Sequence, residues 1–145
     1  DVTIQAQILE LLKKIRDEFN TSIILITHDL GVVADMCDRV YVMYGGKVVE
    51  EGSCNDIFYS GNHPYAWGLL RSVPNPMADM KGKLKPIDGQ PPDLISPPKG
   101  CPFYARCDYA MKVCDMCMPE MTKVSESQRT ACWLLHEMAR KNADN

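Results

Sequence analysis

Hydrophobic positions recur with helical spacing at the start of the chain. Apolar side chains return every three or four residues between residues 2 and 19, and polar side chains fill the opposite side. This spacing predicts a one-sided amphipathic helix that ends at Asn20. Residues 22–27 then form a continuous apolar, β-branched run. Such a run is typical of a strand that is buried on both faces of a parallel sheet.

Shorter elements follow the apolar run. Apolar positions predict a short helix over about residues 30–37, and two strand-like runs flank Gly45-Gly46. Both positions of a tight hairpin turn require a positive φ, which glycine adopts at little cost, so residues 40–50 are predicted to form a hairpin. Ser53 is a candidate N-cap for a helix through about Tyr59.

The second half of the chain has a different character. Pro64 is suited to the first turn of a short helix. Residues 73–100 are rich in Pro and Gly and predict an extended, stiff connector. The remainder is rich in cysteine and is expected to end in a helix near residues 131–140.

These elements predict the α/β class. There are too few of them to form a whole domain. A central parallel strand needs neighbours on both sides, and the sequence offers only one such strand. The chain also opens on Asp1 without an initiating Met. We therefore expect the truncated C-terminal part of an α/β domain, followed by a small, mostly irregular extension with short helices.

Composition narrows the function. The chain of 145 residues is 46% hydrophobic and 24% charged, as expected for a globular protein. Its net charge of −3 argues against nucleic acid as a partner, which would require a basic face. No apolar run has the length of about 20 residues that spans a bilayer, and no signal peptide is recognisable.

The seven cysteines are unevenly distributed, and five lie in the last third of the chain. Their odd number argues against a complete disulfide framework, and clustering of this kind in a reducing compartment more often indicates a metal site or catalysis. The only Cys-x-x-Cys pair is Cys114 with Cys117. A thiol redox protein built on that pair is disfavoured because the preceding strand of a thioredoxin-like site is missing.

His28 directly follows the apolar run. In open α/β sheets, ligands bind beyond the carboxyl ends of the strands, where a histidine can donate a hydrogen bond to a phosphate oxygen. Asp29 could help to orient it. Taken alone, a histidine at a strand end is more often structural, so the surrounding segment has to decide between the two interpretations.

The surrounding segments resemble a known family. Residues 23–34 and 38–52 closely resemble the switch-histidine region of ABC transporter ATPase subunits, and residues 1–8 look like the stretch just after the Walker B carboxylates. His63-Pro64-Tyr65 and the downstream cysteines are similar to the C-terminal extension of the oligopeptide and dipeptide importer branch. On this basis residues 1–60 are expected to be the end of a P-loop ABC ATPase domain, and residues 61–145 the extension.

The resemblance implies roles for three residues. His28 would contact the γ-phosphate of ATP and help to position the attacking water. Asp1 matches the D-loop aspartate at the interface of two ATPase domains, and Asp29 lies beside the switch. The family's phosphate loop, Q-loop Gln, Ser-Gly-Gly-Gln segment and catalytic Glu are absent from this sequence. Because those parts hold ATP and Mg²⁺, we expect this chain alone not to bind or hydrolyse ATP.

For the cysteines, the resemblance implies a ligand set of Cys101, Cys107, Cys114 and Cys132. Members of this branch can carry a four-iron, four-sulfur cluster on these thiolates, which are soft ligands suited to iron–sulfur or zinc sites. Cys117 is extra to that set. Zinc, or no metal in protein handled in air, remains an alternative. A region of about 45 residues buries little core and often needs such a crosslink.

The family implies a whole protein at the cytoplasmic face of the cell membrane. ATP and Mg²⁺ would be its cofactors, and its partners would be a second ATPase subunit, membrane permeases and, indirectly, a peptide-binding protein. We also expect this chain to self-associate, because truncation exposes strand edges and apolar faces. A stand-alone metal-binding module is the alternative, although such a module needs neither Thr27-His28-Asp29 nor the hairpin.

Overall fold

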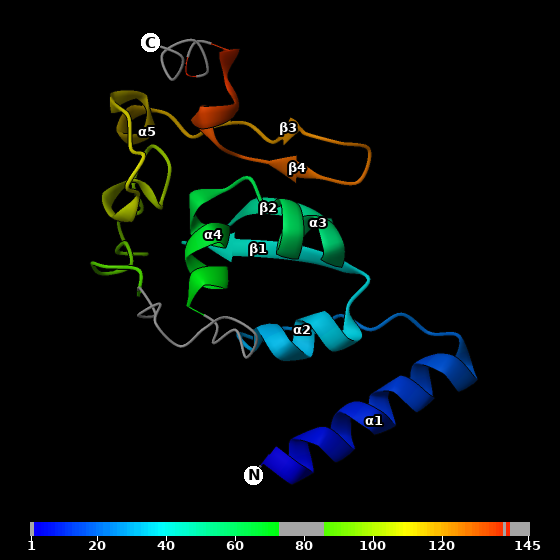
Figure 1. Cartoon of the computed structure of the whole chain (residues 1–145). Coiled ribbons are helices and arrows are strands. Elements are labelled where there is room, and N and C mark those ends of the chain that lie inside the picture. Colours follow the sequence, from blue (N-terminus) through cyan, green and yellow to red (C-terminus); the bar gives the residue numbers. More distant parts are fainter. Residues whose placement is uncertain (1, 73–85, 138, 140–145) are drawn as a thin grey trace, which may run out of the picture. The chain divides into compact units, whose positions relative to one another are not determined.

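The computed structural model describes residues 2–72, 86–137 and 139. The chain divides into two compact units, Asp1–Asp38 and Arg39–Asn145, and each is described here by itself. The first unit holds two helices, and the second holds a small sheet with short helices around it (Figure 1). The chain is therefore of mixed α and β structure.

The first unit contains helices α1 (Val2–Phe19) and α2 (Leu30–Met36), both at the predicted places. Asn20 ends α1 with a left-handed backbone of φ 48°, which Asn tolerates better than most residues. Lys13 Nζ on α1 lies 2.8 Å from Asp35 Oδ2 on α2. This ion pair joins the two helices of the unit.

The prediction of a buried strand over residues 22–27 is wrong for this chain. The segment has no regular secondary structure, and the side chains of Ile24 and Ile26 are 92% and 95% exposed. A strand needs a hydrogen-bonded neighbour, and the described residues contribute none to it. The apolar run therefore stays without a strand partner: Ile24 and Ile26 are exposed, and Ile23 and Leu25 are half-buried.

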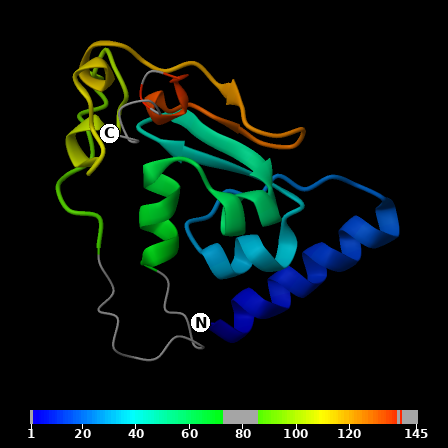
Figure 2. The same ribbon diagram turned by 45° about the horizontal axis from the view of Figure 1, so that its top comes forward.

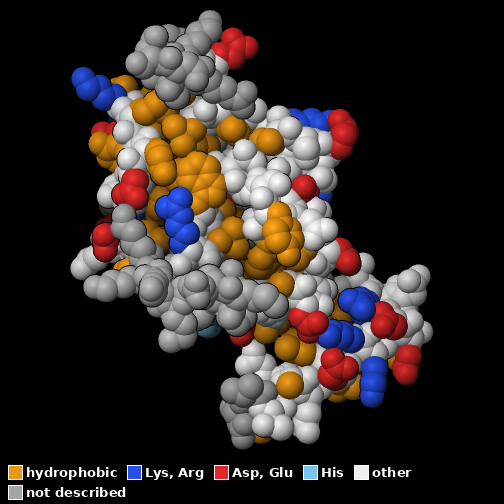
Figure 3. Space-filling model, viewed as in Figure 1, with side chains coloured by type: hydrophobic (Ala, Val, Ile, Leu, Met, Phe, Trp, Pro, Cys, Tyr) orange, Lys and Arg blue, Asp and Glu red, His pale blue; other side chains and the backbone are white. Residues whose placement is uncertain are grey.

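Helix α1 also leaves its apolar side uncovered. Ile8 and Leu11 are 52% and 56% exposed, and Phe19 at the end of the helix is 73% exposed. Lys, Arg, Asp and Glu side chains are spread over the surface of α1 in Figure 3. The structure confirms the amphipathic helix, but much of its apolar half is exposed, and Leu9 and Leu12 are only half-buried.

The second unit is built on the predicted hairpin, β1 (Arg39–Tyr44) and β2 (Lys47–Ser53). Gly45 and Gly46 turn the chain with φ of 55° and 75°, the positive values that the Gly-Gly pair predicts. Two further strands, β3 (Thr122–Lys123) and β4 (Arg129–Thr130), complete an antiparallel sheet in the order β1-β2-β4-β3. Sequence reasoning missed these two strands of two residues each.

Two helices follow the hairpin on one face of the sheet (Figures 1 and 2). Helix α3 (Cys54–Ser60) is capped by Ser53, as predicted, through a capping box with Asp56. Helix α4 (Pro64–Arg71) begins at Pro64, also as predicted. The turn between the two helices brings residues 61–63 back to the sheet.

The cysteine-rich segment is mostly irregular. It contains helix α5 (Lys112–Met116) and the 3-10 turns η1 (Tyr104–Arg106) and η2 (Trp133–Leu135). Residues 86–100 form neither helix nor strand, whereas residues 73–85 of the predicted connector lie outside the described part. The helix predicted at 131–140 starts instead as η2, and residues 138 and 140 are not described.

One core unites the hairpin with the cysteine-rich segment. Its buried members come from β1, β2, α3 and the segment after residue 100, and they are Val42, Tyr44, Val49, Ile57, Cys101, Phe103 and Cys114. Tyr44 and Phe103 meet edge to face with ring centroids 5.1 Å apart. In Figure 3, hydrophobic side chains also gather on the surface over α4 and the neighbouring segment.

Candidate functional site

His28 and Asp29 lie between the extended segment and α2. Asp29 is the N-cap of α2: its Oδ1 accepts hydrogen bonds from Gly31 N at 2.9 Å and Val32 N at 3.2 Å. His28 is exposed at the preceding position. The cap fixes where the chain enters α2, so it also fixes the direction from which His28 projects. Asp1 lies outside the described residues.

Four of the seven cysteines come together. Cys101, Cys107, Cys114 and Cys132 line one cavity of the second unit, although they are spread over 32 positions of the chain. No disulfide joins the cysteines, all of which lie in the described residues, and Cys117 is exposed and does not line this cavity. The structure thus groups the four predicted ligands and separates them from Cys117. Cys37 and Cys54 are half-buried.

Backbone contacts hold the cysteine loops together. Cys101 N donates to Cys114 O at 2.7 Å, and Met111 N donates to Cys114 Sγ at 3.4 Å. A Cβ added at Gly100 would overlap the carbonyl oxygen of Cys114. Only glycine therefore allows the two chain segments to approach so closely, and this approach places Cys101 next to Cys114.

Burial governs the protonation of these thiols. It raises the pKa of the Cys101 and Cys107 thiols, and it raises the pKa of Cys132 to about 12. Neighbouring thiols of the group add to each rise. Without a metal, these three thiols therefore stay protonated at neutral pH, and a metal that binds them must displace their protons.

Backbone amides act on the thiols in the opposite direction. The amides of Phe103, Tyr109 and Leu134 each lower the pKa of the cysteine two positions before them, namely Cys101, Cys107 and Cys132. With Met111 N on Cys114, every sulfur of the group faces a backbone N–H. Such hydrogen bonds favour the thiolate form that metals require. The donor set therefore suits a thiolate-bound group.

Sharing a cavity does not mean that these side chains are already placed around a single metal ion. In residues 2–72, 86–137 and 139, no three His, Cys, Asp or Glu side chains are placed so that they could hold one ion. The four sulfurs share a cavity rather than one coordination point.

His63 lines the same cavity. Its side chain is 1% exposed, and its Nδ1 accepts a hydrogen bond from Tyr65 N at 3.0 Å, which caps α4. Its ring lies 5.9 Å from that of Phe103, centroid to centroid. Burial lowers the pKa of His63 to about 4, so the imidazole is neutral at ordinary pH.

A buried carboxylate anchors the turn that carries His63. Glu50 on β2 is fully buried and accepts hydrogen bonds from four donors of two other segments, the turn before α4 and the β3–β4 hairpin. Its Oε1 accepts from Asn62 N at 2.7 Å, Gln128 Nε2 at 3.0 Å and Thr130 Oγ1 at 3.0 Å. Its Oε2 accepts from His63 N at 3.1 Å. All of these donors are neutral, so hydrogen bonds alone compensate the burial of Glu50.

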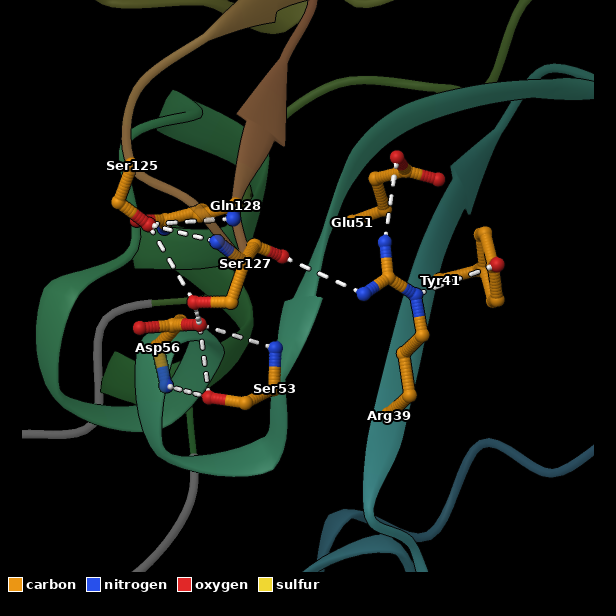
Figure 4. Close-up of polar contacts among 8 residues, drawn as sticks. All are labelled: Arg39, Tyr41, Glu51, Ser53, Asp56, Ser125, Ser127 and Gln128. Carbon is orange, nitrogen blue, oxygen red and sulfur yellow. Dashed lines mark hydrogen bonds and ion pairs between the residues drawn. The ribbon is translucent and has the colours of Figure 1, made fainter.

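A second polar cluster joins the β3–β4 hairpin to β2 and α3 (Figure 4). Asp56 Oδ2 accepts from Ser127 Oγ at 2.6 Å and from Ser53 Oγ at 2.7 Å. Arg39 Nη1 reaches the carbonyl of Ser127 at 3.4 Å, and Arg39 Nη2 lies 3.3 Å from Glu51 Oε1. These contacts hold the late hairpin against the early one.

Sequence reasoning missed Glu50 and its partners. Val48-Val49-Glu50 read as the end of a strand, and nothing local marked its glutamate as buried. The His63-Pro64-Tyr65 motif was noticed, but its place in the cysteine cavity could not be derived from spacing. Gln128 and Thr130 gave no signal, because their partners lie on a strand that is distant in sequence.

Comparison with known proteins finds one family model and several relatives that match this chain. The family model described as the oligopeptide/dipeptide transporter C-terminal region matches residues 49–114, which include Glu50, His63 and three of the four clustered cysteines. The dipeptide transport ATP-binding protein DppD of Bacillus subtilis (strain 168) is 58% identical over 140 residues, which are 96% of this chain and 41% of that protein. This chain is therefore similar, over nearly its whole length, to a part of dipeptide and oligopeptide transport ATP-binding proteins.

Further relatives have similar descriptions. The oligopeptide transport ATP-binding protein OppD of the same Bacillus strain is 53% identical, over 97% of this chain and 39% of its own length. The protein AmiE of Streptococcus pneumoniae (serotype 4, strain ATCC BAA-334 / TIGR4), with the same description, is 49% identical over the same shares. The chain thus spans about two fifths of the curated relatives it matches. A search of the described helices finds none long and apolar enough to cross a membrane.

Proposed function

We propose that this chain is part of the ATP-binding subunit of an importer that moves short peptides across a membrane. The similarity over nearly the whole chain to dipeptide and oligopeptide transport ATP-binding proteins carries this proposal. In the intact subunit, paired ATPase domains would hydrolyse ATP with Mg²⁺ and drive membrane permeases at the cytoplasmic face. A peptide-binding protein would deliver the cargo. Residues 1–60 would belong to the ATPase domain and residues 61–145 to its extension.

Within the intact subunit, His28 would act on the γ-phosphate. It is exposed, and the Asp29 cap holds the start of the helix that follows it, so its side chain is free to meet a nucleotide bound by another part of the protein. Asp29 would keep His28 in place, and Asp1 would act at the interface with the second ATPase domain.

The intact protein tests the role of His28. His28→Ala should lower ATP hydrolysis by about 100-fold or more while ATP binding is retained, because the group that positions the attacking water is lost. Lys99→Ala, at an exposed residue of the extension, is the matched control and should leave hydrolysis unchanged. Hydrolysis at the wild-type rate in His28→Ala would contradict the role.

The isolated chain should not bind ATP measurably. The backbone N–H groups and Lys of a phosphate loop form most of a phosphate cradle, and this sequence contains no such loop. Calorimetry with Mg-ATP should therefore show no binding heat. Micromolar affinity would contradict this part of the proposal.

The isolated chain should self-associate. The apolar side of α1 and the side chains of Ile24 and Ile26 are exposed, and faces of this kind recruit further copies or other chains. Size-exclusion chromatography with light scattering should show a dimer or larger species. A clean monomer would contradict the expectation.

We further propose that the four clustered cysteines bind a four-iron, four-sulfur cluster. Three observations support this: the four thiols share one cavity, each sulfur faces a backbone N–H, and Cys117 lies apart. When bound, the cluster would crosslink loops that otherwise bury little core. Its ligands would be Cys101, Cys107, Cys114 and Cys132.

Protein purified without air tests the cluster. Iron, acid-labile sulfide and a broad visible absorption should appear together and should be lost in Cys107→Ser. Cys117→Ser is the matched control and should keep the wild-type content of iron. Zinc in a colourless sample would overturn the cluster in favour of a zinc site.

A further inference from the structure

We propose that His63 is a positioning residue of the four-cysteine site, whose Nε2–H donates a hydrogen bond to a sulfur of the group held there. The inference rests on the proposed cluster and not on the proposed transport function. It gives a part in the metal site to a residue that is not one of its ligands.

The hydrogen bonds of His63 determine which nitrogen carries its proton. Nδ1 accepts from Tyr65 N at 3.0 Å, so Nδ1 has no hydrogen of its own. A neutral imidazole carries one proton, which must then be on Nε2. His63 is therefore a donor at its far nitrogen, held by the first turn of α4.

The donor on Nε2 has no protein partner in the described part of the chain. Every fully enclosed polar side-chain atom there is hydrogen-bonded, so Nε2 still reaches open space. The side chain is only 1% exposed, and the space it lines is the cavity of Cys101, Cys107, Cys114 and Cys132. A buried N–H without a partner is costly, and the sulfurs of four cysteines are acceptors that line this cavity.

The backbone of His63 is fixed from the opposite side. Its N–H donates to Glu50 Oε2 at 3.1 Å, and that carboxylate is itself held by Thr130 and Gln128. The ring is further packed against Phe103. With both its backbone and Nδ1 bound, His63 has little freedom to turn its Nε2–H away from the cavity.

A hydrogen bond to sulfur has a measurable electronic effect. Donors to cluster sulfurs stabilise the more negative, reduced state and so raise the reduction potential. A histidine that served only as the cap of α4 would affect folding stability and leave the potential unchanged. Potential and stability therefore separate the two roles.

Two substitutions of His63 separate the functions of its two nitrogens, because each variant keeps one function and removes the other. His63→Asn places an amide where Nδ1 lies, so it can still cap α4 but has no group at the position of Nε2. His63→Gln has a longer side chain whose NH₂ reaches the position of Nε2, but it gives up the cap. His63→Asn thus removes only the Nε2–H donor, and His63→Gln removes only the cap of α4.

The experiment uses the whole chain purified without air. Iron and sulfide are quantified, the reduction potential is measured by titration, and thermal unfolding gives the stability. We expect His63→Asn to bind iron with a potential more negative than that of the wild type and with nearly normal stability. His63→Gln should be less stable but should keep the wild-type potential.

Other outcomes overturn the proposal. If wild-type and His63→Asn proteins hold equal iron at equal potential, or if only His63→Gln shifts the potential, His63 does not donate to the cluster, while the cluster itself stands. If wild-type protein prepared without air contains no iron, the cluster proposal and this inference both fall. The transport proposal, which is tested through His28, is unaffected by either result.

Discussion

The N–H of His63 donates to the buried carboxylate of Glu50, with 3.1 Å between N and Oε2. This bond joins a strand of the hairpin to the first residue of the cysteine cavity, 13 positions further along the chain. It therefore links the β-sheet to the candidate metal site. Its removal should disturb both.

Glu50→Gln should destabilise the second unit by about 2–3 kcal/mol, because the new NH₂ group faces donors that need an acceptor. Urea unfolding of the chain measures this loss. Glu51→Gln is the matched control: Glu51 pairs with the half-exposed Arg39 at 3.3 Å, and a surface pair of this kind contributes about 1 kcal/mol or less. Equal losses in the two variants would contradict the special role of Glu50.

The pH dependence of stability should report the burial of His63. Its pKa is lowered from 6.5 to about 4 in the folded chain, so the unfolded chain binds the additional proton between these values. The stability that it contributes is present above about pH 6.5 and is lost as the pH falls towards 4. The loss in the metal-free, reduced chain should approach about 3 kcal/mol.

The control for this pH dependence is His63→Asn, which cannot titrate there. The difference in unfolding free energy between the wild type and this variant should shrink or reverse as the pH falls over that interval. Other groups titrate in both proteins and cancel in the difference. A difference that is constant with pH would show that His63 is not held neutral.

The two turn glycines should respond unequally to a methyl group. At Gly46, alanine meets nothing within 4 Å and bears only the cost of φ 75°, about 1 kcal/mol. At Gly45, φ is 55° and the new Cβ would lie 2.7 Å from Pro102 Cβ. The crowding adds about 1–3 kcal/mol.

Thermal or urea unfolding of Gly45→Ala and Gly46→Ala measures the loss of stability in each variant. The larger loss at Gly45 would show that the turn is pressed against the residue next to Cys101. Equal losses would indicate that the turn and the cysteine-rich segment do not touch.

Ser127→Ala should raise the pKa of Asp56. The hydroxyl of Ser127 is the largest of the contacts that hold this pKa below its usual range, followed by Ser53. A lowered carboxyl pKa contributes stability above its ordinary value and loses it as the pH falls. NMR titration of the Asp56 carboxyl carbon measures the change, and the exposed Ser96→Ala is the control. An unchanged pKa in Ser127→Ala would mean that the bond in Figure 4 is absent in solution.

Local signals gave most of the local structure. The 3.6-residue pattern of α1, the Gly-Gly turn, the Ser53 cap and Pro64 at the start of α4 each depend on neighbouring residues alone, and the structure confirms all four. The apolar run at residues 22–27 failed, because whether such a run becomes a strand depends on neighbours that these residues cannot specify. In the described part of the chain, no strand pairs with residues 22–27.

Some residues of the candidate sites could also be predicted from the sequence, and others could not. The number and clustering of the cysteines alone indicated a metal site or catalysis, and the family resemblance selected four of them as ligands. The structure brings those four to one cavity. Glu50, Gln128 and Thr130 could not be found from sequence, because β2 and β4 pair across more than 70 positions and two-residue strands carry no periodic pattern.

The strand order has a consequence for biosynthesis. Strand β2 pairs with β1 on one side and with β4 on the other, and β4 occupies residues 129–130 of 145. While the ribosome is still making the last part of the chain, β2 has an open edge and Glu50 lacks two of its donors. A nascent chain interrupted before residue 129 would carry that edge permanently, and it should be a preferred client of chaperones and proteases.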